Sequence, residues 1–298
     1  MILSLFSLAY DDVRHEMQAS PAVPVIRVNG EISSTVGINL RTLEETLDQA
    51  FKVRRAVAVA IVINSPGGSP AQANLIGQRL RLLSKERNLP VLAFVEDMAA
   101  SGGYMIAVAA DEIYCDEYSL VGSIGVISAG FGFDRLIEKY GVERRVHTAG
   151  THKSKLDPFK PESASDIEFI RGLLNETHEN FIKLVQTRRG DKLVQDGKVD
   201  LFNGDVWTAK RAQELGLVDG IGEMRETLKS KFGDKVRIIP IRVGPWFLQS
   251  MMSSAERLAL AFGVRAPWSF GAENPISAAG WKQQLSGGAG EGVGIRAE

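Results

Sequence analysis

The fold of this chain is decided by residues 90–110, which read PVLAFVEDMAASGGYMIAVAA. The first part, Pro90 to Val95, is a continuous apolar run that is typical of a buried parallel strand. The last part, Tyr104 to Ala110, is apolar on all sides and of helical length. Between the two, Ser101 stands among alanines and glycines. The stretch therefore predicts a strand, a tight turn and a helix, with Ser101 in the turn.

A second stretch of the same kind comes earlier in the chain. Residues 57–63 form an apolar run rich in β-branched side chains, and helical spacing follows over about 70–86. A further strand is predicted from Val23 to Val28 and a further helix over 40–53. Repeated strand–helix units predict an α/β fold with parallel strands and right-handed crossovers.

Ser101 has two interpretations. A serine at a small-residue turn between a buried strand and a buried helix has the layout of an exposed nucleophile. The helix N-terminus also favours negative charge beside its hydroxyl. The simpler interpretation is a helix N-cap, which is the usual role of a serine at such a junction. The residues around Ser101 leave both interpretations open.

Gly67 and Gly68 follow the strand at 57–63, at the sheet edge where open α/β folds bind ligands. Successive glycines can turn their N–H groups outward, as an oxyanion hole requires, where one donor is worth about 3–4 kcal/mol. A plain strand-to-helix turn is the alternative. The matching position of the Ser101 turn, one unit later, favours the oxyanion hole.

The base that would activate Ser101 is less evident. No acidic residue is evidently placed to orient His147 or His152 as a base. Three lysines lie in the same polar segment of the sequence: Lys153, Lys155 and Lys160. A lysine acts as a base only when it is neutral. Lowering its pKa from about 10.4 to about 7.5 costs roughly 4 kcal/mol, which burial or neighbouring cations must supply. The residues alone leave the base open.

Composition excludes several functions. The 298 residues include 35 basic and 36 acidic side chains, and the net charge of −1 predicts no nucleic-acid partner. Cys115 is the one cysteine, which excludes an internal disulfide and a cysteine-cluster metal site. We expect Cys115 to be a buried, inert thiol. His147 and His152 have a spacing seen in zinc-ligand pairs, but no cysteine pair precedes them and no helix places them on one face, so we expect neither a metal nor a cofactor.

The later part of the chain predicts a helix over 134–140, a strand over 144–148 and a long helix over about 163–188. The long helix would pack on the domain or between subunits. An apolar-rich helix is expected over 246–262, for core or oligomer packing rather than for a membrane surface, and a flexible glycine-rich tail after it.

The first ten residues, Met1 to Tyr10, are apolar but lack the basic start of a signal peptide. They also fall short of the roughly 20 residues of a membrane-spanning helix. We expect this segment to dock or to pack.

Four blocks of the sequence carry a resemblance to a known family: Asn64–Gly68, Ala99–Tyr104, Gly122–Val126 and Gly150–Ser154. With Gly204-Asp205-Val206-Trp207, Ala212 and Gly216–Asp219, they resemble the successive motifs of the signal peptide peptidase A (SppA) family, peptidase family S49, in its single-repeat form. The resemblance spans about residues 22–240. It implies an α/β fold of the ClpP and crotonase type. The domains would be an N-terminal segment (1–21), the peptidase domain (22–240) and a C-terminal helix with its tail (241–298).

The resemblance also implies roles for site residues. Ser101 would be the nucleophile, Lys153 the general base, and Ser123 the hydroxyl that holds the lysine amine. The N–H of Gly102 and an N–H from the Gly67-Gly68 turn would bind the oxyanion. An extended peptide, such as a remnant signal peptide with small or apolar side chains, would lie against the backbone near Gly68 and Gly125 and react through an acyl-enzyme.

Two departures from the family matter. No membrane anchor is recognisable, which favours a cytoplasmic location or a peripheral membrane contact. The motifs occur once, and single-copy members resemble ring-shaped homo-oligomers, so Lys153 would serve Ser101 in its own or in another subunit. A carboxylate within about 4–6 Å would keep the Lys153 amine charged. We therefore expect Asp157 to point away from it. The alternative functions are a crotonase-like acyl-CoA enzyme and an inactive peptide-binding scaffold.

Overall fold

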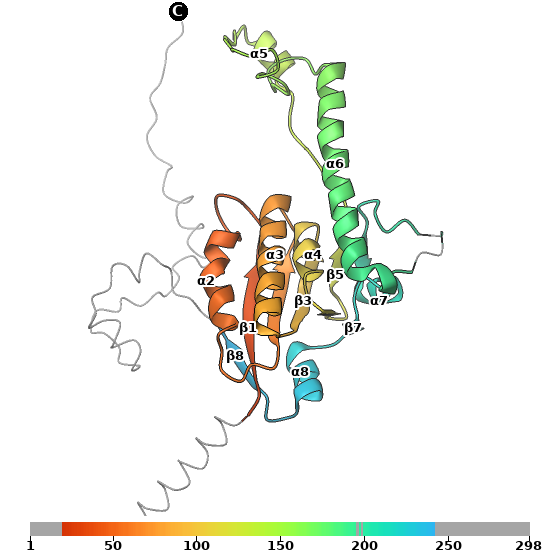
Figure 1. Cartoon of the computed structure of the whole chain (residues 1–298). Coiled ribbons are helices and arrows are strands. Elements are labelled where there is room, and N and C mark those ends of the chain that lie inside the picture. Colours follow the sequence, from red (N-terminus) through yellow and green to blue (C-terminus); the bar gives the residue numbers. More distant parts are fainter. Residues whose placement is uncertain (1–19, 195–196, 198, 242–298) are drawn as a thin grey trace, which may run out of the picture. The chain divides into compact units, whose positions relative to one another are not determined.

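The computed structural model describes residues 20–194, 197 and 199–241 (Figure 1). Its helices are α2 (Leu40–Ala50), α3 (Pro70–Arg87), α4 (Gly102–Ala107), α5 (Asp134–Lys139), α6 (Ala164–Arg189), α7 (Ala209–Glu214) and α8 (Met224–Phe232), with a short 3-10 helix, η1 (Gly190–Lys192). Its strands are β1 (Ala22–Asn29), β2 (Val59–Ser65), β3 (Val91–Ala100), β4 (Glu112–Cys115), β5 (Leu120–Gly122), β6 (Val206–Thr208), β7 (Gly220–Ile221) and β8 (Arg237–Pro240).

The strands form one sheet in the order β6-β5-β3-β2-β1-β8, with β4 paired to both β3 and β7. Within the described residues, the β5–β6 pair is antiparallel and the other pairs are parallel. The α/β fold predicted from the repeated strand–helix units is confirmed. Strand β3 is longer than predicted because one edge of it pairs first with β4 and then with β5. This extension brings Ser101 to the very end of the strand.

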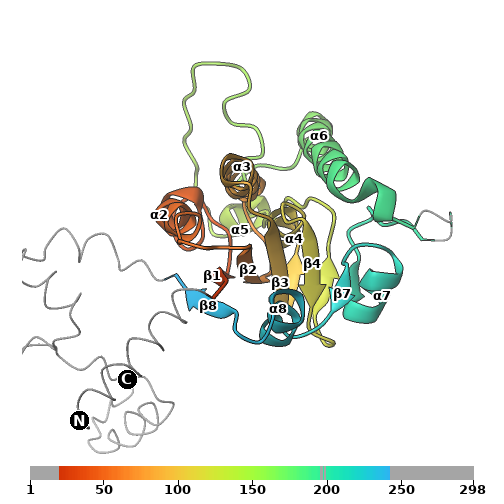
Figure 2. The same cartoon turned by 60° about the horizontal axis from the view of Figure 1, so that its bottom comes forward.

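Strand β2 is apolar throughout because both of its faces are covered. Ile61 and Ile63 belong to the core shared with α2, α3 and α4, and Ala60 and Val62 to the core shared with α8. Figure 2 shows α2 and α3 on one side of the sheet and α8 on the other. Burial on both faces is the reason that a continuous apolar run marks a parallel strand.

Three predicted details are wrong. Helix α2 ends at Ala50 rather than at residue 53. Helix α4 ends at Ala107 rather than at residue 110, and no strand forms over 144–148. Residues 142–148 have no pairing partner among the described strands, and Arg144 is instead held by its side chain to Asp157. We call residues 126–162, which contain α5, the arm. In Figure 1, α5 lies beyond the N-terminal end of α6.

Cys115 is fully buried in β4, and burial raises the pKa of its thiol to about 11. The thiol is therefore protonated near neutral pH, as an inert cysteine should be. Among the helices of the described ranges, none combines the length and the apolar character needed to cross a membrane. The predicted helix at 246–262, the glycine-rich tail and the segment Met1–Tyr10 lie outside the described residues.

Candidate active site

Ser101 is the single residue between β3 and α4. Its backbone has φ of 51° and ψ of −120°, a conformation that costs an L-residue about 1–3 kcal/mol. Its N–H donates to the carbonyl of Gly122 at 2.9 Å, which joins the turn to the end of β5. Ser101 occupies the N-cap position of α4, yet its hydroxyl makes no capping hydrogen bond. The geometry contradicts the N-cap interpretation and leaves the half-buried hydroxyl available.

Gly67 allows the loop after β2 to touch the Ser101 turn. Its φ is 105°, and a Cβ at this position would lie 2.8 Å from the Ala100 carbonyl oxygen, the Gly102 nitrogen and the Ser101 Cβ. A side chain would therefore push the two turns apart. The sequence places glycine where the two backbones must approach most closely.

Gly68 and Gly102 supply neighbouring N–H groups beside Ser101. The Gly68 nitrogen lies 3.4 Å from the point that a Cβ would occupy on Gly102. Neither N–H donates a hydrogen bond within the described part of the chain. The Gly67 N–H, by contrast, donates to Ser65 Oγ at 3.2 Å. Of the predicted Gly67-Gly68 turn, Gly68 is the residue with the free donor, and two such donors side by side can bind an oxyanion.

Ser123 follows β5 with φ of 52°, and its backbone is fixed from two directions. Its N–H donates to the Asp205 carbonyl at 2.7 Å. The next carbonyl, of the fully buried Ile124, lies 3.2 Å from Nε2 of His178 on α6. Since a carbonyl only accepts, Nε2 is the donor. The Gly125 N–H donates to the Ser123 carbonyl at 3.0 Å, so the Ser123–Gly125 segment is held rigidly.

A cavity of about 930 Å³ joins these elements. It is lined by the two glycine turns, by the Ser123 segment, by one face of α6 and by the loop before β6, namely Pro66, Gly68, Pro70, Ala71, Asn74, Ser101, Gly102, Met105, Ser123, Gly125, Val126, Ile127, Thr177, Asn180, Phe181, Leu184, Asn203 and Gly204. Phe181 and Met105 are buried and make part of the wall apolar. Apolar walls with a few convergent polar groups are typical of a binding site.

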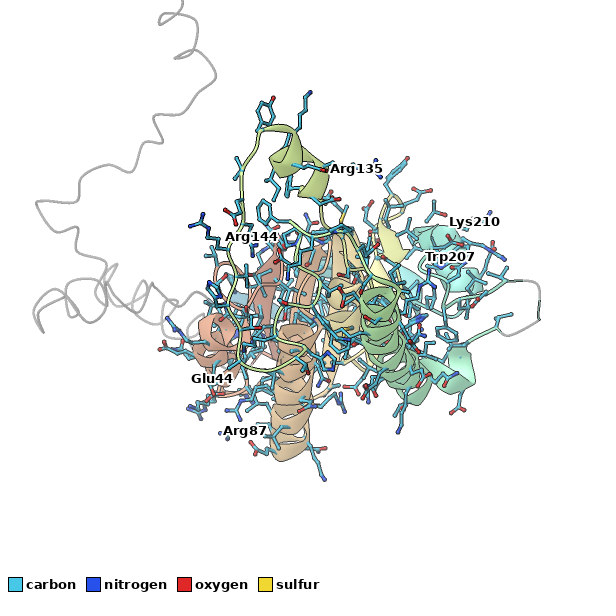
Figure 3. The ribbon with its side chains drawn as sticks, turned by 90° about the horizontal axis from the view of Figure 1, so that it is seen from above. Glu44, Arg87, Arg135, Arg144, Trp207 and Lys210 are labelled. Carbon is cyan, nitrogen blue, oxygen red and sulfur yellow. The ribbon has the colours of Figure 1, made fainter. Side chains whose placement is uncertain are left out.

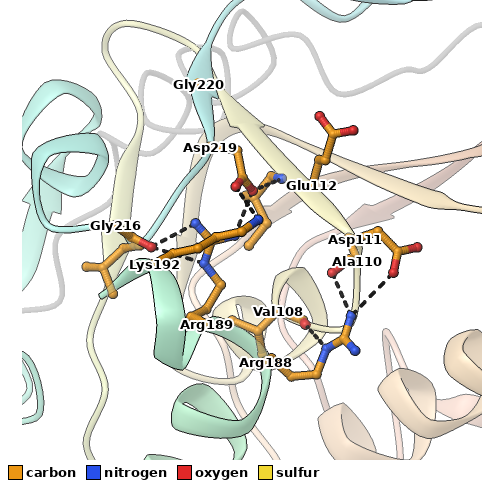
Figure 4. Close-up of polar contacts among 12 residues, drawn as sticks. Val108, Ala110, Asp111, Glu112, Arg188, Arg189, Lys192, Gly216, Asp219 and Gly220 are labelled. Carbon is orange, nitrogen blue, oxygen red and sulfur yellow. Dashed lines mark hydrogen bonds and ion pairs between the residues drawn. The ribbon is translucent and has the colours of Figure 1, made fainter. Parts of the chain in front are cut away.

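Helix α6 is attached to the domain by two arginines at its C-terminal end (Figure 4). Arg188 donates to the carbonyls of Val108, Ala109 and Ala110, just beyond the end of α4. Arg189 is almost fully buried and pairs with Asp219 at 2.6 Å. These contacts hold the cavity wall of α6 against α4, the helix that follows Ser101.

The charge of Asp219 depends on the same contacts. Burial acts to raise the pKa of this carboxyl, but hydrogen bonds from Arg189, Lys192 and the Ile113 N–H outweigh it and lower the pKa below its usual value. Nearby, the buried Tyr104 hydroxyl donates to the Leu217 carbonyl at 2.7 Å, and burial raises its pKa.

Lys153 is not brought to the cavity of its own chain. It lies on the arm, it is exposed, and it is absent from the cavity lining. Within the described residues its amine forms no ion pair, whereas the Lys155 amine lies 4.5 Å from the Phe169 ring centroid and 3.5 Å from the Ser165 carbonyl. Asp157 accepts from Arg144 at 3.1 Å and does not pair with Lys153.

The part that sequence reasoning missed is the face of α6 that carries Thr177, His178, Asn180, Phe181 and Leu184. The helix was predicted, but its spacing indicated only packing, and nothing in it marks His178 as a contact of the Ser123 segment. In the described ranges, no three His, Cys, Asp or Glu side chains are grouped so as to hold a metal ion.

Comparison with known proteins identifies similar chains. Residues 84–235 match the family model described as peptidase family S49, and this segment contains Ser101, Ser123 and Lys153. The α/β sheet described above is consistent with the ClpP and crotonase type of fold expected for that family.

Three relatives illustrate the range of similarity. A Brucella abortus protein named "Na(+)/H(+) antiporter NhaA" is 52% identical over 222 residues, which cover 72% of this chain and 30% of that protein. "Serine protease SPPA, chloroplastic" of Arabidopsis thaliana is 30% identical over 218 residues, 69% of this chain and 31% of the relative. "Probable protease SohB" of Buchnera aphidicola is 30% identical over 207 residues, 70% of this chain and 60% of the relative. The chain thus spans less than two thirds of the length of each.

Proposed function

The chain belongs to peptidase family S49, and on that basis we propose that it is a serine endopeptidase with Ser101 as nucleophile and Lys153 as general base. The observation that carries the proposal is the Ser101 turn, where a strained serine with a free hydroxyl lies beside the unpaired N–H groups of Gly68 and Gly102. The Brucella relative is named as an antiporter, but the match covers 30% of it, and the Arabidopsis and Buchnera relatives are named as proteases.

The reaction proceeds in two halves. Ser101 Oγ attacks the peptide carbonyl while its proton passes to the neutral amine of Lys153, and the Gly68 and Gly102 N–H groups bind the resulting oxyanion. The C–N bond then breaks, and Lys153 returns the proton to the leaving amine. A water molecule, deprotonated by Lys153, attacks the ester, and the proton goes back to Ser101 as the acid product leaves. Ser123 holds the Lys153 amine, and no cofactor takes part.

Lys153 is a better base than its neighbour Lys155 because the Lys153 amine forms no ion pair within the described residues. Lys155 is engaged by Phe169, and the one carboxylate close in sequence, Asp157, is engaged by Arg144. A lysine becomes neutral when it is buried away from anions. The exposed position of Lys153 in the single chain therefore supports burial in a neighbouring subunit's cavity, in trans.

The arm is suited to such a contact. Its large apolar side chains Ile127, Phe131, Tyr140 and Val142 are strongly exposed, and exposed apolar patches commonly mark protein–protein contacts. In Figure 3, Arg135 and Arg144 on the arm lie apart from Trp207 and Lys210. We expect a homo-oligomeric ring in which each arm completes the site of the next subunit.

The substrate is an extended peptide that lies between the Gly68 turn and Gly125, with small or apolar side chains in the pocket walled by Met105, Phe181 and Leu184. Remnant signal peptides have this character.

The test is covalent labelling with a fluorophosphonate, read by intact mass. Wild type should gain one adduct on Ser101, and Ser101→Ala none. Lys153→Ala should label far more slowly, and it should not digest a peptide library. No adduct in assembled wild type, or equal labelling of Lys153→Ala, would show that this dyad is not the catalytic machinery.

A further inference from the structure

The Gly67-Gly68 turn has a backbone neighbour on each of two sides. Gly67 admits the Ser101 turn on one side. Gly68, whose φ is 132°, admits Ile32, which belongs to the loop after β1. A Cβ on Gly68 would overlap the Ile32 carbonyl oxygen and would lie 2.9 Å from the Ile32 carbonyl carbon. The two successive glycines therefore serve two different contacts, and the second contact is with Ile32.

Two hydrogen bonds hold Ile32 against this turn. The Ile32 N–H donates to the Gly67 carbonyl at 2.8 Å, and the Ser69 N–H donates to the Ile32 carbonyl at 2.7 Å. Ile32 and Gly68 thus form a parallel bridge that continues the pairing of β1 with β2. In a trans peptide, the C=O of one residue and the N–H of the next point in opposite directions. Because the Gly67 carbonyl faces Ile32, the Gly68 N–H points away from Ile32.

The side chain of Ile32 reaches the residue that supplies the second donor. Its Cδ1 lies 3.3 Å from the point that a Cβ would occupy on Gly102, and the Gly68 nitrogen lies 3.4 Å from the same point. The Ile32 side chain is fully buried, so its position is fixed by packing. Ile32 therefore contacts Gly68 through its backbone and Gly102 through its side chain.

The loop that carries Ile32 is itself closed by hydrogen bonds. The Ser33 N–H donates to the Ile38 carbonyl at 2.9 Å, and the Ile38 N–H donates to the Glu31 carbonyl at 3.2 Å. Ile38 is buried in the same core as Ile32. Ile32 thus lies between Ile38 and the Gly68 turn, and it is held from both sides.

We propose that Ile32 is a positioning residue of the oxyanion hole, an inference that rests on the proposed peptidase function. Ile32 sets the direction of the Gly68 N–H and its distance from the Gly102 N–H. An oxyanion hole depends on donors that are aligned before the reaction begins. Ile32 is not among the described residues that line the Ser101 cavity. A change at Ile32 should therefore act on kcat and leave KM nearly unchanged.

The first test compares substitutions at two isoleucines that are buried in the same core, Ile32 and Ile26. Ile26 is the matched control because it lies within β1, where it pairs with Ile61. Ile32→Val, which lacks Cδ1, should lower kcat about threefold, and Ile32→Ala at least about tenfold, with KM changed less than about twofold. Ile26→Val and Ile26→Ala should keep the wild-type kcat. Equal kcat losses at the two positions would show that core packing in general, and not Ile32, controls the site.

Hydrogen exchange resolved to single residues tests the Ile32 contact without any enzyme activity. In wild type, the Ser69 N–H is bonded to Ile32 and should exchange slowly, whereas the N–H of the exposed Gly68 should exchange faster. Ile32→Ala should accelerate exchange at Ser69 by at least about tenfold, Ile32→Val should accelerate it less, and the Ile26 variants should not change it.

The outcomes separate this inference from the peptidase function. Equal exchange at Ser69 in the Ile32 and Ile26 variants would overturn the contact. Faster exchange with an unchanged kcat in Ile32→Ala would overturn the positioning role. If wild type neither hydrolyses peptides nor labels at Ser101, the proposed function fails, and the exchange comparison alone then decides whether Ile32 holds the Gly68 turn.

Discussion

The carboxylate of Asp157, whose side chain is 4% exposed, accepts a hydrogen bond from Arg144 Nε at 3.1 Å. The guanidinium of Arg144 also lies 4.6 Å from the centre of the Phe159 ring, which packs against Phe133. The arm thus has a small core of its own, and Lys153 sits on the loop that this core supports. The Asp157 carboxylate therefore stabilises the arm through Arg144, and it is not available as an anion partner for the Lys153 amine.

Replacing Asp157 should therefore disable the enzyme without unfolding it. Asp157→Ala leaves Arg144 without its partner; because the Arg144 side chain is 41% exposed, we expect the lost pair to cost about 1 kcal/mol or less. We expect peptide hydrolysis to fall at least about tenfold while the thermal midpoint of the sheet domain stays within a few degrees. The control is Arg145→Gln, which breaks the exposed pair with Glu143. Full activity of Asp157→Ala would mean that the arm does not need the Arg144–Asp157 pair in order to present Lys153.

The contact between the Gly67 loop and the Ser101 turn gives a second prediction. Gly67→Ala places a Cβ 2.8 Å from three backbone and side-chain atoms. It should displace the Gly68 donor and lower kcat by about 10²–10³, the usual loss for one oxyanion donor. Gly30→Ala is the control, because Gly30 has a similar φ of 109° but open space around it. Similar kcat losses in both variants would indicate backbone strain alone.

Much of the fold was predictable because its signals are local. The run at 57–63 is apolar since β2 is buried on both faces, and Gly67 and Ser101 stand at turns where the backbone conformation demands small residues. The false strand at 144–148 is instructive. Its residues have strand-like composition, but strands form only where a partner edge exists, and none of the described strands pairs with them.

The site was less predictable because its wall comes from far away in the sequence. His178 lies 54 positions from Ile124, and Phe181 lines the cavity from α6, which Arg188 and Arg189 attach to the residues after α4 and to Asp219. No periodicity encodes such a pairing. Lys153 is a related case, since its proposed partner belongs to another molecule.

Complementation tests that arrangement. Ser101→Ala and Lys153→Ala are each expected to be inactive alone. Co-refolded in equal amounts, they should regain about a quarter of wild-type activity if each site takes its lysine from a neighbour, because about one interface in four then pairs an intact serine with an intact lysine. If the lysine acted within its own chain, every site would lack one member, and mixing would restore nothing. Refolding each variant separately and mixing afterwards controls for slow subunit exchange.

His178 should act as a positioning residue for the Ser123 segment. His178→Leu removes the donor to the Ile124 carbonyl and should lower kcat about tenfold, the value of one hydrogen bond, with a smaller change in KM. His178→Gln, which can still donate, should recover most of the loss. Thr187→Val is the control, because the Thr187 hydroxyl donates to the Lys183 carbonyl within the same helix at 2.7 Å and Thr187 is not part of the cavity lining. A loss in His178→Leu that Gln does not recover would assign His178 a packing role only.

The lowered pKa of Asp219 predicts acid sensitivity of the α6 attachment. The folded-state pKa lies below the unfolded value of 3.8, so the ionised carboxylate stabilises the fold above that pH, and this stabilisation is lost as the pH falls through the folded value. Asp219→Asn removes the charge and leaves Arg189, 3% exposed, without its anion. It should therefore be less stable than wild type by about 3–5 kcal/mol near neutral pH. In urea unfolding, the gap between the two proteins should narrow below pH 3.8, because wild type then loses the same charge. Asp234→Asn, at an exposed position, should show no such gap. A difference between wild type and Asp219→Asn that stayed constant into the acid range would mean that the Asp219 charge does not hold α6 in place.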